Sequence, residues 1–343
     1  MIDNDEVVLG IERSLTGKRW EASSSDERTV RALGQKFGLS DIVSRVLVAR
    51  GIELENVEVF LHPSLRVLLP DPSNLCDMDV ATARIATAIN AGETIGIFGD
   101  YDVDGATSAA LLHRFIEAVG GRVEIYVPDR INEGYGPNLP ALLAMREKGI
   151  RVVVTVDCGI TAFEPLAGAA EAGIEVIVVD HHAAEPRLPK AVAVVNPNRI
   201  DDESEMGRLA AVGVSFLLVV ALNRRLRTNG WYDNRREPDL LQWLDLVALG
   251  TVCDVVPLVG LNRAFVAQGL KVMANRKNIG IRALADAASV DEAPTAYHAG
   301  YILGPRVNAG GRVGEAGMGA RLLTTASSDE ARDIALHQFH SLG

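Results

Sequence analysis

The feature that most constrains the fold of this chain is a series of five short apolar runs that alternate with stretches of helical character. The runs lie at 94–98, 122–127, 152–156, 176–179 and 192–195 and are rich in β-branched residues. Helical stretches around 106–119, 139–148 and 162–172 separate the first four runs. Repeated β-α-β units of this kind fold as a parallel β-sheet with helices on both faces. We therefore predict an α/β fold.

The segments on either side of this pattern are expected to be mainly helical. Candidate helices lie at 41–50, 54–61 and 77–91, and prolines between the last two mark a connecting segment. We predict a helical N-terminal region at 1–80, the α/β domain at 81–260 and a mainly helical extension at 261–343.

Composition and charge limit the class of protein. Apolar residues make up 48% of the chain, enough for a large core, and the three cysteines form no C-x-x-C pair, which fits a reducing cytoplasm. Residues 1–10 are acidic rather than signal-like, and the longest apolar stretch, 209–222, is too short for a bilayer and predicts a buried helix. We expect a cytoplasmic protein without a membrane partner. The net charge of -11 argues against a generally basic nucleic-acid-binding surface, but carboxylates of a metal site contribute to that sum.

Carboxylates and imidazoles recur directly after the predicted strands. Parallel strands end at one edge of a sheet, and ligands gather beyond those carboxyl ends, so we expect these side chains to meet there. One more acid follows an apolar helix at 240–249. Each residue alone could be a solvated turn, a helix cap or a surface histidine. Their recurrence at one edge favours a shared cation, because like charges placed this close repel one another. In chain order, the candidates are Asp100, Asp102, Asp104, Asp157, Asp180, His181, His182 and Asp254.

The acidic stretch that begins at Asp100 is not an EF-hand calcium loop. D-x-D-x-D-G also opens such a loop, but a bidentate glutamate must stand at its twelfth position. That position is Leu111, and a predicted strand rather than a helix precedes the stretch.

The chemistry of the candidate ligands indicates hydrolysis at phosphorus. Carboxylate and imidazole ligands without a thiolate suit Mn²⁺ or Mg²⁺ better than structural zinc. The acids outnumber the needs of one ion, so we expect two divalent ions, about 3.5–4 Å apart, that stabilise the attacking and leaving oxygens. The residues alone predict a phosphoesterase or a phosphoanhydride hydrolase.

Six ordered motifs resemble those of a known family. G-D-Y-D-V-D-G-A-T-S, V-D-C-G-I, V-D-H-H and G-T-V-C-D-V-V-P-L are similar to the four motifs of the DHH phosphoesterase superfamily. P-D-R-I-N-E-G-Y-G-P-N at 128–138 and G-P-R-V-N-A-G-G-R at 304–312 resemble the RecJ family of single-strand-specific 5′→3′ DNA exonucleases. The resemblance runs from about residue 40 to the end. It implies a DHH catalytic domain at 81–260 and a metal-dependent exonuclease of DNA repair and recombination that acts on single-stranded DNA with a 5′ end.

The resemblance also implies a role for each metal ligand. Asp102 and Asp104 would each hold a different ion, and Asp157 would bridge the two. His182 and Asp254 would complete the second site.

Other residues would act beside these ligands. By the same resemblance, His181 would lie beside the scissile phosphate as a ligand or proton donor, and Asp100 and Asp180 would support the ligands. The stretch 304–312 would be a substrate loop that grips phosphate. By this resemblance, the substrate residues would be Arg306, Asn308 and Arg312, with Arg130 and Tyr135 as further candidates along the DNA path.

Two departures from the family pattern give further expectations. Some superfamily members have a histidine ligand where this chain has Phe98, so the first ion is expected to have one protein ligand fewer. RecJ proteins continue into a second substrate-binding domain and an OB-fold, so we expect this chain to represent the N-terminal catalytic half, with weak, salt-sensitive and poorly processive cleavage.

Two alternative functions remain open from the sequence. A DHH phosphodiesterase of short oligonucleotides or cyclic dinucleotides, or a pyrophosphatase, would use the same ligands. A non-catalytic scaffold of this fold in replication is the second alternative, although such proteins have lost acids that this chain retains.

Overall fold

The computed structural model describes residues 10–21, 26–313 and 316–340 and divides into two compact units, Met1–Ser64 and Leu65–Gly343. The helices of the first unit are α1 (Glu27–Phe37), α2 (Asp41–Ala49) and α3 (Val57–Leu61). Leu33, Leu47 and Val57 form its small core. The predicted boundaries at 80 and 260 stay predictions.

Helix α1 was absent from the sequence prediction, although its end signals are present. Asp26 caps the helix by accepting a hydrogen bond from the backbone N–H of Arg28, and Gly38 ends it with a φ of 65°. Ser40 caps α2 in the same way, through Val43. These short polar side chains satisfy amides that have no partner within a helix.

The second unit contains the predicted all-parallel sheet, and the α/β fold class is confirmed. The strands are β1 (Thr94–Gly99), β2 (Arg122–Tyr126), β3 (Val152–Val156), β4 (Glu175–Val179) and β5 (Ala193–Val195). Their order across the sheet is β2-β1-β3-β4-β5. The chain reverses its direction of travel between β1 and β3, and such a switch point opens a crevice beyond the strand ends. Both strands lead directly into predicted site residues.

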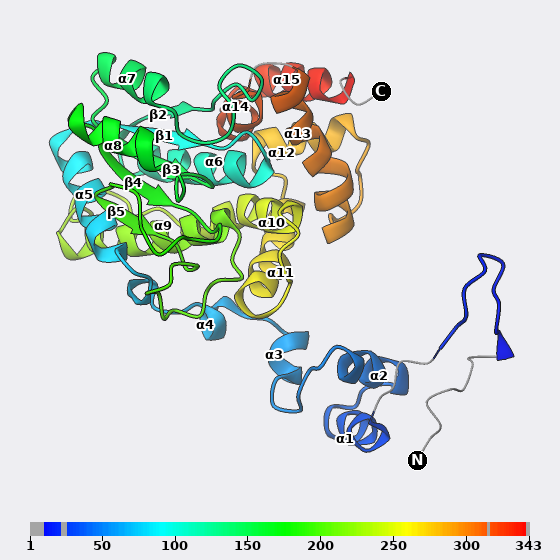
Figure 1. Ribbon diagram of the computed structural model, residues 1–343. Helices are drawn as coiled ribbons and strands as arrows, with labels where there is room; N and C mark the ends of the chain where they lie inside the picture. Colours follow the sequence, from blue (N-terminus) through cyan, green and yellow to red (C-terminus); the bar gives the residue numbers. More distant parts are fainter. Residues whose placement is uncertain (1–9, 22–25, 314–315, 341–343) are drawn as a thin grey trace. The chain divides into compact units, whose positions relative to one another are not determined.

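Helices cover both faces of this sheet (Figure 1). Alternate side chains of the strands point to opposite faces, so Ile97 and Val154 join one core while Phe98 and Val153 join the other. The first core includes residues of α5 (Met78–Ala91), α6 (Val103–Ala118) and α9 (Ala211–Thr228). The second includes residues of α7 (Leu139–Glu147) and α8 (Phe163–Glu171). Burial on both faces explains why β1, β3, β4 and β5 read as nearly continuous apolar runs, whereas the partly exposed β2 also carries charged residues.

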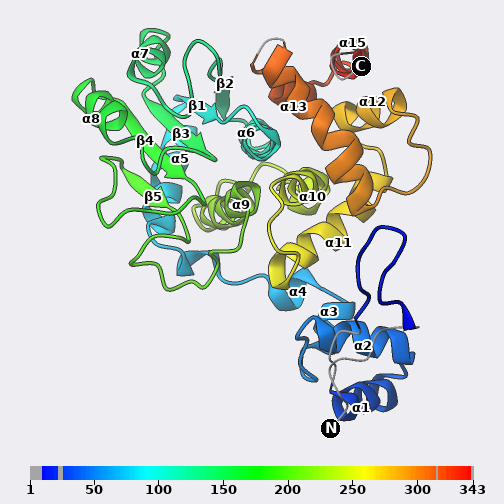
Figure 2. The same ribbon diagram turned by 45° about the vertical axis from the view of Figure 1, so that its right-hand side comes forward.

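The remaining elements are helical, as predicted (Figure 2). Among the described residues, no helix is both long enough and apolar enough to cross a membrane. The elements are α4 (Leu65–Leu68), η2 (Pro72–Asn74), η3 (Leu240–Trp243), α10 (Leu244–Cys253), α11 (Gly260–Ala274), α12 (Ile279–Ala287), the π-helical turn η4 (His298–Leu303), α13 (Gly304–Val313), α14 (Met318–Thr324) and α15 (Ser328–His340).

The prediction of a loop at 304–312 is wrong, because this stretch forms most of α13. The turn η4 runs directly into α13, so the glycine-rich segment starts from an existing helical turn. Pro305 stands at the junction of η4 and α13, where it lacks the backbone N–H that could bond back into η4. Val307 and Ala309 are buried, and these apolar contacts outweigh the low helix propensity of the glycines.

Candidate metal centre

Three carboxylates are fixed at one edge of the sheet by the strands that precede them. Asp100, Asp157 and Asp180 are the first residues after β1, β3 and β4. Each donates its backbone N–H to the carbonyl oxygen of the last residue of the neighbouring strand in the sheet, which is β3, β4 and β5 in turn. The N···O distances are 3.3, 3.0 and 3.1 Å respectively. The ladder of the sheet therefore extends by one residue and holds the three side chains in adjacent rows. Asp157 also has a φ of 61°, an uncommon left-handed conformation for a residue other than glycine.

The next two acids lie at the start of α6. Asp102 caps this helix by accepting a hydrogen bond from the N–H of Gly105 at 3.0 Å, and Asp104 lies in the first turn. Close backbone approach requires glycine at this point, because a Cβ on Gly105 would lie 2.5 Å from the carbonyl oxygen of Asp100. A Cβ on Gly250 of α10 would lie 3.0 Å from Oδ1 of Asp104. These two glycines allow α6 and α10 to approach the sheet edge and each other.

Asp104 also holds the start of the buried helix α9. Its Oδ2 accepts from the N–H of Ala211 at 2.6 Å, and its Oδ1 accepts from the N–H of Val212 at 2.9 Å. The N-cap residue Ala210 has no side chain that could satisfy these amides. A negative charge at a helix N-terminus is also favoured by the helix dipole.

Substitution Asp104→Ala is therefore expected to lower the free energy of unfolding by about 1–3 kcal/mol in metal-free buffer, since two buried amides of α9 lose their acceptor. Urea denaturation measures this change. Asp157→Ala is the matched control, because no described residue donates a hydrogen bond to its Oδ1. Equal stability of the Asp104→Ala and wild-type proteins would show that Asp104 does not hold α9.

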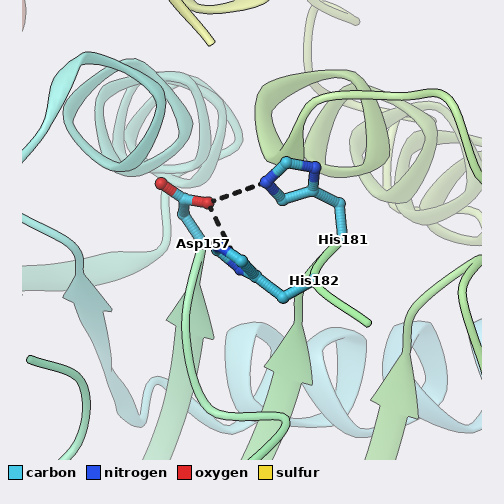
Figure 3. Close-up of side chains that lie close together, drawn as sticks. All are labelled: Asp157, His181 and His182. Atoms are coloured by element: carbon cyan, nitrogen blue, oxygen red, sulfur yellow. Dashed lines mark ion pairs between the residues drawn. The ribbon is translucent and has the colours of Figure 1, made fainter. Parts of the chain in front are cut away.

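The two histidines extend from the end of β4 towards Asp157 (Figure 3). Nε2 of His181 lies 3.3 Å from Oδ1 of Asp157, and Nδ1 of His182 lies 4.0 Å from the same oxygen. Nδ1 of His181 is 3.1 Å from the carbonyl oxygen of Leu209. A carbonyl oxygen can only accept, so Nδ1 of His181 carries a proton and donates it. In the neutral ring, Nε2 of His181 therefore presents its lone pair to the acids.

Asp180 lies behind this pair and orients His182. Its Oδ1 is 2.7 Å from Nδ1 of His182, and its Oδ2 accepts from the N–H of Ile160 at 3.0 Å. Burial opposes the charge, but the hydrogen bond from His182 is the leading contribution that lowers the pKa of Asp180. The same hydrogen bond raises the pKa of His182. This pairing is typical of a carboxylate that orients a metal-binding imidazole.

Asp254 is the last acid of the cluster and comes from a helix rather than from a strand end. It directly follows α10, and its Oδ2 lies 3.7 Å from Nδ1 of His181. The seven residues that offer ligand atoms at this edge are called the metal centre below. They are Asp100, Asp102, Asp104, Asp157, His181, His182 and Asp254.

The metal centre fits divalent cations. Three groups have ligand atoms that all lie within 4.8 Å of one another: Asp157 with both histidines, Asp104 with His181 and Asp254, and Asp100 with Asp102 and Asp157. Several buried atoms here have no hydrogen-bond partner among the described residues, including Oδ1 of Asp157, Nε2 of His181 and Oδ2 of Asp254. Orphaned buried atoms of this kind need an explanation, and an ion that accepts their lone pairs supplies one.

The electrostatics of the metal centre also favour a cation. Burial first, and then the charge of Asp254, raises the pKa of Asp104 well above its usual value. Burial and the charges of Asp104 and Asp102 do the same to the pKa of Asp157. The pKa of Asp100 rises to about 7, through burial and then Asp102. Without positive charge, these carboxylates destabilise one another, and bound cations would relieve that repulsion.

The predicted substrate residues lie outside the three ligand groups. Tyr135 donates its hydroxyl to the carbonyl oxygen of Asp157 at 3.0 Å, so it borders the metal centre. The guanidinium of Arg130 lies 5.0 Å from the ring centroid of Tyr101, which follows the first acid. Arg306 and Asn308 lie on α13, which packs against α6 and α10. The side chain of Arg312 lies outside the described residues.

Sequence reasoning missed two asparagines that hold the histidine pair. Asn196 donates to the carbonyl oxygen of His182 at 2.9 Å, and Asn198 donates to the carbonyl oxygen of His181. Asn196 directly follows β5 and Asn198 lies two residues later, at the same edge of the sheet. Because ligands gather beyond the carboxyl ends of parallel strands, the polar stretch N-P-N after the fifth apolar run could have been included among the candidates.

The position of Phe98 explains how the chain accommodates it in place of a histidine. Its side chain is fully buried in the second core, with its ring centroid 5.3 Å from that of Tyr126. The ring therefore packs as part of the sheet and offers no ligand to the metal centre.

Comparison with known proteins agrees with this geometry. Residues 94–251 match the model of the DHH family, N-terminal domain. The single-stranded-DNA-specific exonuclease RecJ of Bacillus subtilis is 35% identical over 319 residues, which is 92% of this chain and 39% of the relative. RecJ of Salmonella typhimurium is 39% identical over 302 residues, 87% of this chain and 52% of the relative.

Solved structures match as well. A crystal structure of exonuclease RecJ bound to manganese has a TM-score of 0.69 and 35% identity, and the match covers 78% of this chain and 66% of that protein. RecJ of Thermus thermophilus in complex with Mn²⁺ has a TM-score of 0.77 and 30% identity over 93% of this chain and 44% of that protein. The chain spans about half or less of the length of the curated relatives described above. By its motifs, its sheet and these relatives, the chain belongs to the RecJ family of DHH proteins.

Proposed function

We propose that this chain is the catalytic part of a metal-dependent exonuclease that hydrolyses phosphodiester bonds of single-stranded DNA from a 5′ end. One observation carries the proposal: carboxylates and imidazoles from four separate segments of the chain meet at the sheet edge with buried, unpartnered ligand atoms. The relatives are named single-stranded-DNA-specific exonucleases. A role in DNA repair and recombination, in the cytoplasm, follows from the family resemblance.

The ions held at the metal centre would be manganese or magnesium, as in the solved RecJ structures. Asp157 belongs to two of the three ligand groups, which supports a bridging role, with Asp104 and Asp254 in one group and Asp102 in another. His181 belongs to two groups and His182 to one. When bound, such ions activate water and neutralise charge on the phosphate.

The other residues of the site would position substrate and protons. Nδ1 of His181 is held by the carbonyl of Leu209, so its Nε2 is the nitrogen that can bind an ion or, when protonated, donate to a leaving oxygen. Asp180 keeps His182 in place, and Tyr135, which borders Asp157, would line the path of the strand together with Arg130. Arg306, Asn308 and Arg312 lie on one helix, α13, and would grip phosphate from there.

A substrate panel tests the proposal with the chain as it stands. Single-stranded and duplex DNA labelled at either end, dinucleotides, cyclic dinucleotides and pyrophosphate are incubated with Mn²⁺ or Mg²⁺. We expect single strands to be degraded from the 5′ end, with mononucleotides as the products. Preferred hydrolysis of dinucleotides or pyrophosphate would assign the chain to a small-substrate phosphohydrolase instead. No Mn²⁺ binding by calorimetry at millimolar concentration would assign it to the non-catalytic scaffolds.

A further inference from the structure

Two tyrosines outside the metal centre present their rings to solvent. Tyr297 directly precedes the turn η4, and Tyr301 lies within it; the two residues are 61% and 75% exposed. Their ring centroids are 5.4 Å apart and their planes differ by 26°, so the rings stack on each other. Large aromatic rings are usually buried, and a stacked pair left in water offers its π-faces to a binding partner.

The turn that carries this pair packs on the end of α10, the helix that leads into the metal centre. The turn η4 packs tightly on the last turn of α10: a Cβ on Gly300 would lie 3.1 Å from Cγ1 of Val252, and a Cβ on Gly304 would lie 2.3 Å from Sγ of Cys253. The next residue after Cys253 is Asp254, a member of the metal centre. A side chain at position 304 would clash with Cys253 and one at position 300 would crowd Val252, so this close packing ties the position of η4 to that of Asp254.

The backbone at the start of η4 is also anchored. His298 is buried, its Nδ1 accepts from the N–H of Thr295 at 3.0 Å, and its Nε2 lies 3.1 Å from Oε1 of Glu292. The ring of Tyr297 contacts His298 edge-on, with centroids 5.8 Å apart. Single π-helical turns occur frequently at functional sites, and here the turn places residues four apart side by side. The aromatic pair is therefore preorganised.

We propose that Tyr297 and Tyr301 form a stacking platform for the bases of a single nucleic-acid strand whose phosphate lies at the metal centre. The proposal rests on the proposed function and adds a binding subsite to it. Stacking on aromatic rings accepts every base, which suits an enzyme that degrades a strand regardless of sequence. In a duplex the base faces are already stacked and paired, so a platform of this kind selects single strands.

The size of the exposed surface argues for a strand rather than a second protein. Two aromatic side chains bury at most about 150–250 Å² each, whereas a stable protein interface buries about 1,200 Å² or more. Val255, just after the end of α10, is a further exposed apolar side chain, and it adds little to the apolar area that the two tyrosines expose. One or two bases match the platform in area.

Binding without cleavage tests the platform. The full chain is titrated with a fluorescent oligothymidylate in the presence of a chelator, so that no strand is cut. The double variant Tyr297→Ala/Tyr301→Ala is expected to bind about tenfold more weakly or worse, because each stacked base is lost. Tyr297→Phe/Tyr301→Phe keeps both rings and should restore binding. Ile200→Ala removes an equally exposed apolar side chain elsewhere and is the matched control.

Cross-linking locates the contact directly. An oligonucleotide with 5-iododeoxyuridine is irradiated on the wild-type protein, and peptides are identified by mass spectrometry; cross-links at Tyr297 or Tyr301 support the platform. Unchanged affinity of the double alanine variant would overturn it. So would a wild-type dimer in sedimentation that the variant does not form, because the rings would then join two copies. If the wild-type protein cleaves no single-stranded DNA with Mn²⁺, the proposed function itself fails.

Discussion

Replacement of Asp157 by alanine is expected to reduce manganese-dependent cleavage of a 5′-labelled single strand by more than about a hundredfold. Substitutions of residues that merely orient metal ligands cost 10–100-fold in affinity or activity. Asp157 contributes to two of the three ligand groups, so its loss affects both. Initial rates of product formation on denaturing gels, at saturating Mn²⁺, measure the effect.

Folding of this variant should remain intact, which separates lost chemistry from lost structure. Burial and neighbouring acids raise the pKa of Asp157, so its charge destabilises the metal-free fold and its removal should not lower the melting temperature. Asp291→Ala removes an exposed aspartate that belongs to none of the three ligand groups and should cleave at the wild-type rate. Activity of Asp157→Ala within about tenfold of wild type would contradict a role for Asp157 as a shared ligand.

Divalent cations are expected to stabilise the folded protein strongly, and their removal should abolish cleavage. A ligand present at a hundred times its dissociation constant, and bound only by the native state, adds about 2.7 kcal/mol to the free energy of unfolding. For a chain of 343 residues, with an unfolding entropy of about 2.1 cal/mol/K per residue, that corresponds to a rise in melting temperature of about 4 °C. The physical reason is relief of repulsion among Asp100, Asp104 and Asp157, whose pKa values are all raised.

Differential scanning calorimetry in Mn²⁺, in Mg²⁺ and with excess chelator measures this shift. Asp254→Asn should lose most of the shift, because it removes one charge from the group that contains Asp104 and His181. Asp291→Ala should retain it. Equal melting temperatures of the wild-type protein with chelator and with millimolar Mn²⁺ would show that the acids do not form a metal centre.

Local patterns in the sequence were sufficient for the elements of the sheet. The predicted strands agree with β1 to β5 to within one residue at each end. Burial on both faces gives β1, β3, β4 and β5 short apolar runs, and this information lies within a few neighbouring residues. Local patterns gave a wrong prediction, a loop, for the glycine-rich stretch 304–312. Its helical state depends on burial of Val307 and Ala309 rather than on local propensity.

The meeting of the acids could also be expected from the chain alone, because parallel strands deliver their final residues to a common edge. What the sequence could not determine was which atoms remain without a partner there. Asp104 accepts from α9 amides that lie 107 and 108 residues away, and His181 donates to a carbonyl 28 residues away. No local pattern encodes such contacts.

The sequence by itself thus determined the class of fold, the parallel strands and the set of charged side chains that gather beyond them. Only the tertiary structure decided the order of the strands, the division of the acids into three ligand groups and the exposure of the stacked Tyr297 and Tyr301. The physical reason is range: hydrophobic periodicity reports the burial of a residue among its chain neighbours, whereas ligand geometry depends on the packing of segments distant along the chain.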